Sequence, residues 1–257
     1  MPNPMDLTGR TIIVTGAGQG IGRAIAGTVV ALGGNAVLVE RNETTLAEAA
    51  GALPGERALA LAGDVSDPGF AASAVERTVA RFGAVHGLVN NAGIIRPAMI
   101  DKMSLVDWNA VIAVNLTGCY LMLQAVGRHM IGRAKEGDKN PGAIVNISSV
   151  AGKRGSVGQI NYASAKAGLF GLTMSAAREW GRFGVRVNSV GFGMVETQMT
   201  EVVRGPKFRD KYLEGIPLGR FSTPQEVANP ICFLLSEGAS YITGQNITVC
   251  GGMNLQP

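Results

Sequence analysis

The chain has 257 residues, of which 46% are hydrophobic, 16% charged and 5% aromatic, and its formal net charge is +4. This composition excludes an intrinsically disordered chain, and the length suits one large α/β domain with a sizeable core. The bases are scattered and aromatic rings are few, whereas a nucleic-acid binder typically has a clustered basic face with stacking rings. We attribute the charge to a mild surface bias that can help attract an anionic substrate.

The cysteine spacing and the N-terminal residues argue against further classes of protein, namely metal-binding, secreted and membrane-spanning proteins. Cys119, Cys232 and Cys250 are well separated and lack metal-type spacing, so we expect buried free thiols in a reducing compartment and no metal site. His86 and His129 are isolated and are expected to be structural or surface residues. No signal peptide is expected in MPNPMDLTGR, and no run approaches the ~18 apolar residues of a membrane span. A cytoplasmic protein is predicted.

Short apolar runs alternate with helical patterns along the whole chain. Strands are expected at 11–16, 35–40, 57–65, 85–93, 142–149, 185–191 and 245–252. Helices are expected at 21–34, 43–53, 68–82 and 161–184, and the apolar stretch from Ser104 to about Gly132 predicts one bent helix or two abutting helices. Alternating elements with strands apolar on both faces predict a single-domain, doubly wound Rossmann fold with a seven-stranded parallel sheet and helices on both faces.

Two regions interrupt this alternation. The polar segment 132–142 predicts a surface loop. The long segment 194–221 keeps apolar residues throughout and is expected to be a substrate lid rather than a linker. No internal repeat or second domain boundary is visible, so residues 1–257 are expected to form one domain.

A glycine-rich turn, TGAGQGIG (15–22), follows the first predicted strand and opens the first helix. Its glycines, at 16, 18, 20 and 22, turn the chain tightly and keep side chains away from its surface. Backbone N–H groups and a helix N-terminus can then meet a pyrophosphate. A flexible turn is the alternative, but the strand-to-helix context favours a dinucleotide site.

The glycines contain the spacing G-x-x-x-G-x-G instead of the usual G-x-G-x-x-G. Together with NNAG at 90–93, Asn115 in VNLTG, ISS at 147–149 and YASAK at 162–166, this pattern resembles the classical short-chain dehydrogenase/reductase family over nearly the whole chain. Tyr-x-x-x-Lys alone is common by chance, whereas the ordered set is highly specific. The resemblance implies an oxidoreductase that interconverts a secondary alcohol and a ketone by hydride transfer.

Tyr162 and Lys166 are four residues apart on a predicted helix and share one face. An ammonium group near a phenol favours the phenolate, so the pair is a credible acid/base, although an ordinary surface pair has the same spacing. The resemblance makes Tyr162 the acid/base and Lys166 the ribose contact. It assigns the substrate oxygen to Ser149 and a relay water to Asn115, for which a hydrogen bond at a helix kink is the alternative.

The resemblance also defines a cofactor-binding set. Its members are Gly16, Gly18, Gln19, Gly20, Ile21, Gly22, Glu40, Arg41, Asp64, Val65, Asn90, Asn91, Ala92, Gly93, Tyr162, Lys166, Val195 and Thr197. Within it, Asp64 is implied to contact adenine beside Val65, although Asp67 capping the next helix also explains the GDVSD motif.

The end of the second strand bears on the choice of cofactor. There, Glu40 can accept hydrogen bonds from both adenosine ribose hydroxyls and would repel a 2′-phosphate. Arg41 could instead clamp that phosphate, but Gln19 in the glycine-rich turn adds no second positive charge. We therefore favour NAD, with NADP possible, and expect Arg41 to stack on adenine or lie in solvent.

The substrate side departs from the family pattern. Phe192 stands where the family has proline, and Cys250 where it has aspartate. Expected pocket residues are Ile94, Ser149, Val150, Ala151, Gln159, Tyr162, Gly193, Met194 and Met199, with Arg96, Lys153 and Arg154 at the mouth. A steroid, an acyl thioester, a polyol and a simple ketone all remain open as substrates.

Two alternative functions are considered. A 3-oxoacyl-[acyl-carrier-protein] reductase using NADPH or NADH would share nearly all these motifs and would need a basic docking patch, for which Arg128, Arg133, Lys135 and Arg182 are available. A non-catalytic nucleotide-binding scaffold is remote because the catalytic set is intact.

Assembly is predicted from two long helical segments. Apolar residues extend beyond one stripe in 107–131 and 161–183, which predicts a homo-oligomer, and the resemblance suggests a homotetramer. No nucleic-acid or membrane partner is expected.

Overall fold

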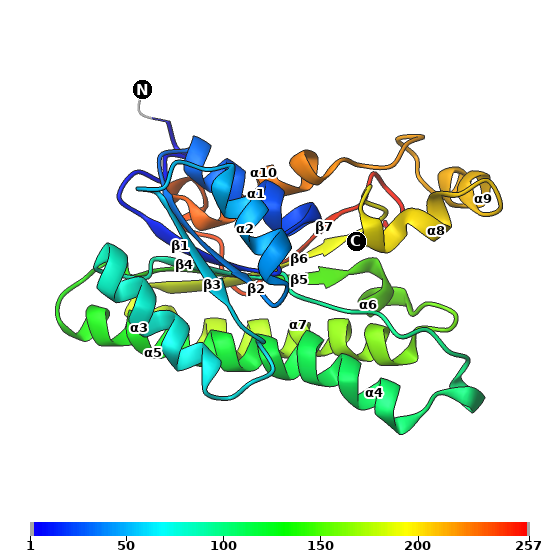
Figure 1. Ribbon diagram of the computed structural model, residues 1–257, viewed down its shortest axis with the longest axis horizontal. Coiled ribbons are helices and arrows are strands. Elements are labelled where there is room, and N and C mark those ends of the chain that lie inside the picture. The colour runs from blue at the N-terminus through cyan, green and yellow to red at the C-terminus, as the bar shows by residue number, and fades with distance from the viewer. Residues whose placement is uncertain (1–2, 256–257) are drawn as a thin grey trace.

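The computed structural model describes residues 3–255 and contains a seven-stranded parallel sheet in the order β3-β2-β1-β4-β5-β6-β7 (Figure 1). The strands are β1 Thr11–Thr15, β2 Asn35–Glu40, β3 Ala58–Ala62, β4 Gly87–Asn90, β5 Gly142–Ser149, β6 Val185–Phe192 and β7 Asn246–Val249. The strand order reverses between β1 and β4, which is where open α/β sheets bind ligands. The predicted doubly wound Rossmann fold is confirmed.

Ten α-helices occur within residues 3–255. They are α1 Gly20–Ala31, α2 Glu43–Gly51, α3 Phe70–Phe82, α4 Leu105–Ile112, α5 Cys119–Lys135, α6 Val150–Arg154, α7 Ile160–Trp180, α8 Glu201–Arg204, α9 Arg209–Glu214 and α10 Pro224–Leu235. Helices α1, α2 and α10 cover one face of the sheet, and α3, α4, α5 and α7 cover the other (Figure 1).

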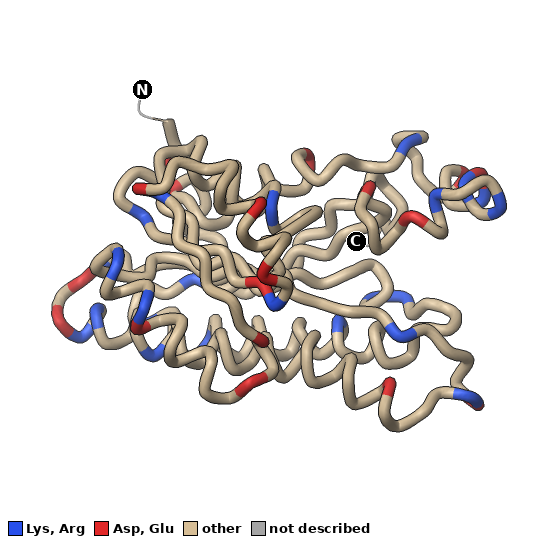
Figure 2. The backbone as a smooth tube through the Cα atoms, in the orientation of Figure 1, with Lys and Arg blue, Asp and Glu red and all other residues tan. Residues whose placement is uncertain are grey.

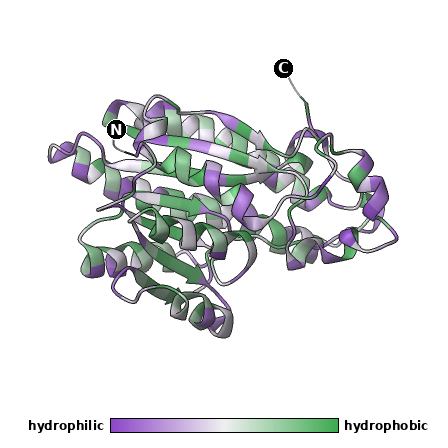
Figure 3. Ribbon diagram, turned by 90° about the horizontal axis from the view of Figure 1, so that it is seen from above, coloured by the Kyte–Doolittle hydropathy of each residue, from purple (hydrophilic) through white to green (hydrophobic). Residues whose placement is uncertain are grey.

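Hydrophobic residues predominate in the strands of the sheet (Figure 3). They are divided between two separate cores, one on each face of the sheet. In β1, Ile12 and Val14 pack under α1, whereas Ile13 between them packs toward α3 and α5. This division follows from the alternation of side chains along a strand. The edge strand β3 differs from the expected two-sided burial, because only Leu61 among its residues is fully buried.

The apolar stretch after Ser104 folds as α4 and α5 joined by a π-helical turn, Ala113–Gly118, which agrees with the second of the two expected arrangements, two abutting helices. Helix α5 continues to Lys135, so the predicted polar loop begins four residues later than expected. By length and mean hydropathy alone, the stretch Leu105–Lys135 is apolar enough to cross a membrane, although polar residues interrupt it. Within this fold it is a core helix, because Met122, Val126 and Met130 are fully buried against the sheet.

Charged residues are spread over the helices and loops, and both signs occur on the segment containing α8 and α9 (Figure 2). No buried residue occurs in α8, α9 or the 3₁₀ turn Gln198–Thr200. The segment is fixed at its far end, where Ile216 and Phe221 are buried. Segment 194–221 therefore contains little core of its own.

Candidate active site

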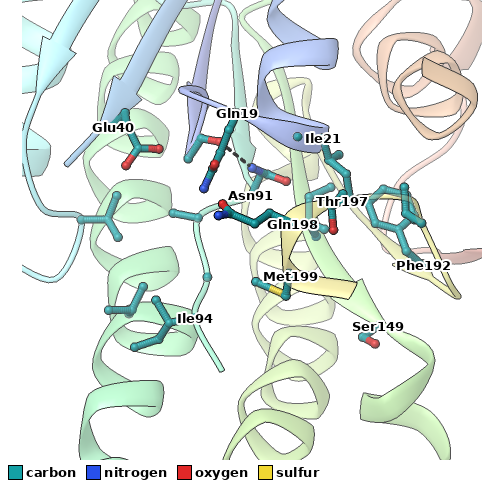
Figure 4. Close-up of a pocket in the computed structure, with 18 of the residues that line it drawn as sticks. Gln19, Ile21, Glu40, Asn91, Ile94, Ser149, Phe192, Thr197, Gln198 and Met199 are labelled. Carbon is teal, nitrogen blue, oxygen red and sulfur yellow. Dashed lines mark hydrogen bonds between the residues drawn. The ribbon is translucent and has the colours of Figure 1, made fainter. Parts of the chain in front are cut away.

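A cleft of about 450 Å³ opens at the carboxyl ends of the strands, where the strand order reverses (Figure 4). It is lined by the turn after β1, the end of β2, the loops after β3 and β4, the end of β5, the start of α7 and the segment after β6. Residues far apart in the sequence therefore meet in one elongated cavity.

The glycine-rich turn has the backbone conformation and clearance that a dinucleotide requires. Gly16 and Gly20 have positive φ angles of 64° and 54°. A Cβ on Gly22 would lie 2.1 Å from the carbonyl oxygen of Gly16, so a larger residue cannot fit without moving the turn. Helix α1 begins with Gln19 as N-cap and has no side-chain cap, which leaves its N-terminus available to an anion.

The loop after β4 is hydrogen-bonded to the glycine-rich turn. Asn91 Nδ2 donates to the carbonyl oxygens of Thr15 and Gly16, at 2.9 and 3.1 Å. The Thr15 hydroxyl accepts from the backbone N–H groups of Asn91 and Ala92, each at 3.0 Å. These contacts hold two walls of the cleft together before any ligand binds.

At the end of β2, the carboxylate of Glu40 lies in the cleft and is fixed by the backbone (Figure 4). Its Oε1 accepts from the N–H groups of Arg41 and Asn42 at 2.8 and 3.2 Å, and its Oε2 accepts from Gly18 at 3.4 Å. A Cβ on Gly18 would meet Glu40 Cγ at 2.8 Å, so the glycine makes room for this side chain.

Arg41 pairs with Asp64 across the mouth of the cleft. Its guanidinium lies 3.6 Å from Asp64 Oδ2, and its side chain is 74% exposed. The Ser66 hydroxyl donates to Asp64 at 2.7 Å and is the main cause that lowers the pKa of this carboxyl, with a smaller contribution from Arg41. Asp67 instead accepts from the N–H of Gly69, the residue before α3.

Ser149, Tyr162 and Lys166 line the same cleft. Lys166 is 3% exposed, its Nζ donates to the carbonyl oxygen of Ile147 at 2.6 Å, and it lies 5.7 Å from the centre of the Tyr162 ring. Ser148 is buried and donates to the carbonyl oxygen of Lys166 at 2.8 Å. The Oγ of Ser149 accepts a hydrogen bond from Ala151 N–H at 3.1 Å. This bond uses the oxygen only as an acceptor and leaves the hydroxyl hydrogen available to a ligand.

Asn115 lies in the π-helical turn between α4 and α5 and is fully buried behind the cleft. Its Oδ1 accepts from Ile94 N–H at 2.8 Å, and its Nδ2 donates to the carbonyl oxygen of Ile94 at 2.9 Å. A π-turn inside a helix often marks a functional position. The side chain thus links the helix to a residue that lines the cleft.

Several residues predicted to bind a ligand do not line the cleft: Gly18, Gly22, Asn90, Asn115, Val150, Ala151, Gln159 and Met194. Asn90 points into the core, where its amide donates to Cys119 O and Asn146 Oδ1. Gln159 is the N-cap residue of α7 and forms a parallel bridge with Ala98. Met194 lines a neighbouring pocket of about 120 Å³ with Cys250.

The structure also brings residues to the cleft that sequence reasoning missed: Val39, Asn42, Gly63, Val114, Ile147, Gln198 and Thr200. Phe192, noted only as a substitution, also lines the cleft and is 5% exposed. Gln198 and Thr200 were within reach of prediction, because they flank Met199 in the turn that follows Thr197.

The expected basic groups at the mouth are mostly engaged by the fold. Lys153 Nζ donates to the Thr248 hydroxyl at 2.7 Å, and Arg154 donates to the carbonyl oxygen of Met253 at 3.4 Å. Arg96 stays largely exposed beside Asp107, 4.0 Å away. Among residues 3–255 no three potential ligands gather as a metal site.

The two histidines serve the sheet as hydrogen-bond acceptors. His86 Nδ1 accepts from Thr11 N–H and His129 Nε2 accepts from Val85 N–H, each at 3.1 Å. Burial, with the nearby charge of Arg133, lowers the pKa of His86 to about 4 and also lowers the pKa of His129. Both are structural and lie outside the cleft.

Comparison with known proteins agrees with this geometry. Residues 16–254 match the family model described as enoyl-(acyl carrier protein) reductase. The chain is 43% identical to 3-oxoacyl-[acyl-carrier-protein] reductase FabG of Aquifex aeolicus, covering 96% of this chain and 98% of the relative. It is 38% identical to the (3R)-3-hydroxyacyl-CoA dehydrogenase of Canis lupus familiaris, covering 98% and 99%.

A solved structure supports the same assignment. It is a crystal structure of a protein assigned as a short-chain alcohol dehydrogenase from Sinorhizobium meliloti, with a TM-score of 0.91, 33% identity and 98% coverage of both chains. The fold and cleft define a dinucleotide-binding α/β oxidoreductase. The chain belongs to the short-chain dehydrogenase/reductase family, as its motifs predicted, and the family implies a nicotinamide cofactor.

Proposed function

We propose that the protein is an NAD(H)-dependent oxidoreductase that interconverts a secondary alcohol and a ketone, with Tyr162 as general acid/base. The observation that carries this proposal is the convergence of Ser149, Tyr162 and buried Lys166 in a cleft that also contains the glycine-rich turn. The turn fits a dinucleotide, because the positions of Gly16 and Gly22 leave no room for a Cβ.

Each catalytic side chain has a distinct task in this proposal. When bound, the nicotinamide cofactor supplies or accepts the hydride. Tyr162 donates its phenolic proton to the substrate oxygen in reduction and takes it back in oxidation. Ser149 donates its free hydroxyl hydrogen to the same oxygen. The Lys166 ammonium, held by Ile147, favours the phenolate form of Tyr162.

The preference for NAD rests on Glu40. Its carboxylate is fixed by three backbone N–H groups and faces the cleft, so a 2′-phosphate beside it would meet a fixed negative charge. Arg41, the base that could offset this charge, is paired with Asp64. The remaining predicted contacts, including Asp64, Val65, Asn91 and Thr197, belong to the same proposal.

The test compares NADH with NADPH over a panel of ketones that includes a 3-oxoacyl thioester. We expect a kcat/KM at least about tenfold higher with NADH, since burying a phosphate beside a carboxylate costs more than ~1.4 kcal/mol. Glu40→Gln should narrow the difference because it removes the charge and keeps the side-chain shape. Glu48→Ala removes an exposed acid on α2 and is the control. Equal rates with both cofactors in the wild type would refute the NAD assignment.

A second candidate function, 3-oxoacyl-[acyl-carrier-protein] reductase, is favoured by the name of the Aquifex aeolicus relative. The expected docking patch gives it little support. Arg133 is occupied by Asp138 and by the carbonyl oxygens of Val85 and Pro141. Arg182 lies beyond the end of α7, about 30 Å from Tyr162 at ~1.5 Å per helical residue. Turnover of a carrier-protein thioester above the matching simple thioester would favour this second function.

Assembly, lid and location complete the proposal. Leu105, Val106 and Met174 are exposed by 71%, 78% and 51% on α4 and α7, which supports a homotetramer, and light scattering would test it. Segment 194–221 is proposed as the substrate lid, because Gln198, Met199 and Thr200 line the cleft while α8 and α9 contain no buried residue. Free cysteines support a cytoplasmic location.

A further inference from the structure

One short segment on the substrate side of the cleft is held at alternate residues. We call residues 94–98, which follow the loop after β4, the strap. At one end, Ile94 lines the cleft (Figure 4). Both its backbone N–H and its carbonyl oxygen are hydrogen-bonded to the Asn115 side chain. At the other end, Ala98 N–H donates to the carbonyl oxygen of Gly158 at 2.9 Å, next to its bridge with Gln159.

The middle of the strap is held by Asn161, the residue before Tyr162. Asn161 is fully buried. Its Nδ2 donates to the carbonyl oxygen of Arg96 at 3.0 Å and to that of Asp107, at the start of α4, at 3.3 Å. Its Oδ1 accepts from the backbone N–H of Tyr162 at 2.8 Å. One side chain therefore touches the strap, α4 and the backbone of the catalytic tyrosine.

The contact with Tyr162 has a specific consequence for the first turn of α7. The first four N–H groups of a helix have no partner within the helix, and the N-cap residue Gln159 supplies no side-chain bond here. Asn161 provides an acceptor for Tyr162 instead. The same amide fixes the turn that carries Tyr162 relative to the wall containing Ile94.

We propose that Asn161 is a positioning residue that fixes Tyr162 relative to the strap, and through the strap relative to Asn115 and the substrate wall. This inference rests on the proposed function of Tyr162. Asn161 does not line the cleft and acts only through the groups it holds. Loss of the tie lets the strap and the first turn of α7 move apart, and a displacement of ~1 Å is enough to lower a rate up to about 100-fold.

A buried asparagine with a purely structural role provides the matched control. Asn188 in β6 is also fully buried, its Nδ2 donates to Ile242 O at 2.8 Å, and its Oδ1 accepts from Gln245 N–H at 3.0 Å. These bonds join β6 to the segment before β7 and touch no cleft residue. Replacement of either asparagine by serine removes similar bonds, so both variants should lose thermal stability.

The experiment measures Asn161→Ser and Asn188→Ser in the full chain. For Asn161→Ser we expect kcat/KM for the best ketone of the panel to fall at least about tenfold, while the Kd for NADH, followed by its fluorescence, stays within about twofold. For Asn188→Ser we expect both quantities to stay within about twofold despite the lower Tm. Equal kcat/KM in the two variants would overturn the proposal.

Amide hydrogen exchange on the wild-type protein gives a second measurement that needs neither folding of a variant nor turnover. If Asn161 ties these elements together, the N–H groups of Ile94, Ala98 and Tyr162 should open with one common free energy. Fast exchange at Ile94 and Ala98 beside a protected Tyr162 would overturn the tie. If the wild type reduced no ketone, the proposed function would fail, and exchange alone would still decide whether Asn161 joins the strap to α7.

Discussion

The two sides of the cleft are built differently. On the cofactor side, close approach of backbone atoms fixes the shape: Gly16 and Gly22 have no room for a Cβ, and Asn91 bonds directly to the turn. On the lid side, a Cβ on Gly219 would meet nothing within 4 Å, and α8 and α9 have no buried residue.

This contrast indicates where the chain can vary without losing its chemistry. A wall defined by backbone contacts offers one shape, which suits a ligand that never changes, such as a dinucleotide. A segment with few buried contacts opens at low free energy and tolerates substitution, which suits a substrate gate. We therefore expect substrate specificity to depend on the lid, and the hydride chemistry to depend on the rigid half of the molecule, which is the cofactor side of the cleft.

The largest effect is expected from Tyr162→Phe, which leaves both walls intact and removes only the proton donor. We expect kcat to fall about 100-fold to 10,000-fold, the range typical of general acid/base catalysis, with the Kd for NADH within about twofold. Steady-state rates and fluorescence titration measure the two quantities. Tyr120→Phe, on the exposed side of α5, is the control. Unchanged turnover in Tyr162→Phe would remove Tyr162 from the mechanism.

The next largest effect tests the rigid wall itself through Gly22→Ala. The added Cβ would lie 2.1 Å from Gly16 O and 2.7 Å from Asn91 Nδ2, so the turn must move. We expect a loss of about 1–3 kcal/mol in unfolding free energy, as in overpacked sites, and a marked rise in the Kd for NADH.

Gly27→Ala is the control for that variant, because Gly27 lies on the same helix and a Cβ there meets nothing within 4 Å. Alanine in a helix interior should stabilise the protein by up to about 1 kcal/mol and leave cofactor binding unchanged. If Gly22→Ala bound NADH as well as Gly27→Ala, the cofactor wall would be less rigid than its contacts imply.

The stability of the sheet and that of the lid are expected to depend differently on pH. The pKa of His86 is lowered from 6.5 to about 4, so between these pH values the unfolded chain binds a proton that the folded chain does not, and stability falls as pH falls. Allowing for partial exposure, we expect a loss of about 1–2 kcal/mol, measured by urea unfolding. His86→Asn, which keeps an acceptor for Thr11, should reduce this slope, and His129, whose pKa burial also lowers, should account for part of what remains.

The ion pair between Arg220, near the end of the proposed lid, and Glu226, at the start of α10, should not respond over the same range. Hydrogen bonds from Arg220, foremost, and Thr223 lower the pKa of Glu226 from 4.5 to about 2. Its contribution is present above pH 4.5 and is lost only as pH falls toward 2. Cleavage of the lid by a protease active at both pH values should therefore change little between pH 6.5 and 5. An increase parallel to the loss of global stability would contradict this separation.

The rigid half was largely predictable from the sequence, because its rules are local. Short stretches of sequence are enough to indicate the alternating strands and helices and the glycines at a strand-to-helix turn. The fold that these features predicted is the one observed. The proposed catalytic set was inferred by resemblance, and its members Ser149, Tyr162 and Lys166 line one cleft. The partial exposure of the edge strand β3 was missed, because an apolar sequence does not say which strand lies at the edge.

The residues that sequence reasoning misplaced depend on side-chain direction. Asn90 and Asn91 are neighbours in one motif, yet Asn90, the last residue of β4, points into the core, whereas Asn91 begins the following loop and points toward the glycine-rich turn. Met194 and Gln159 were assigned to the pocket by their place in loops, whose path no local rule fixes. Asn161 was missed because the sequence alone does not show whether an asparagine near a helix start is buried and hydrogen-bonded to other segments or is an ordinary helix residue.

The smallest effect is expected on the lid, from Met199→Ala. Met199 lines the cleft and is 46% exposed, so its removal changes the shape of the substrate wall and costs the fold little packing. We expect KM for the bulkiest ketone of the panel to change about twofold to tenfold, since one or two methylene contacts are worth ~1 kcal/mol, with Tm and the Kd for NADH unchanged. Val202→Ala, at a side chain 78% exposed and outside the cleft, is the control. If Met199→Ala instead lowered Tm as much as Gly22→Ala, the lid would be part of the rigid half, and substrate choice would have to be sought in the strap.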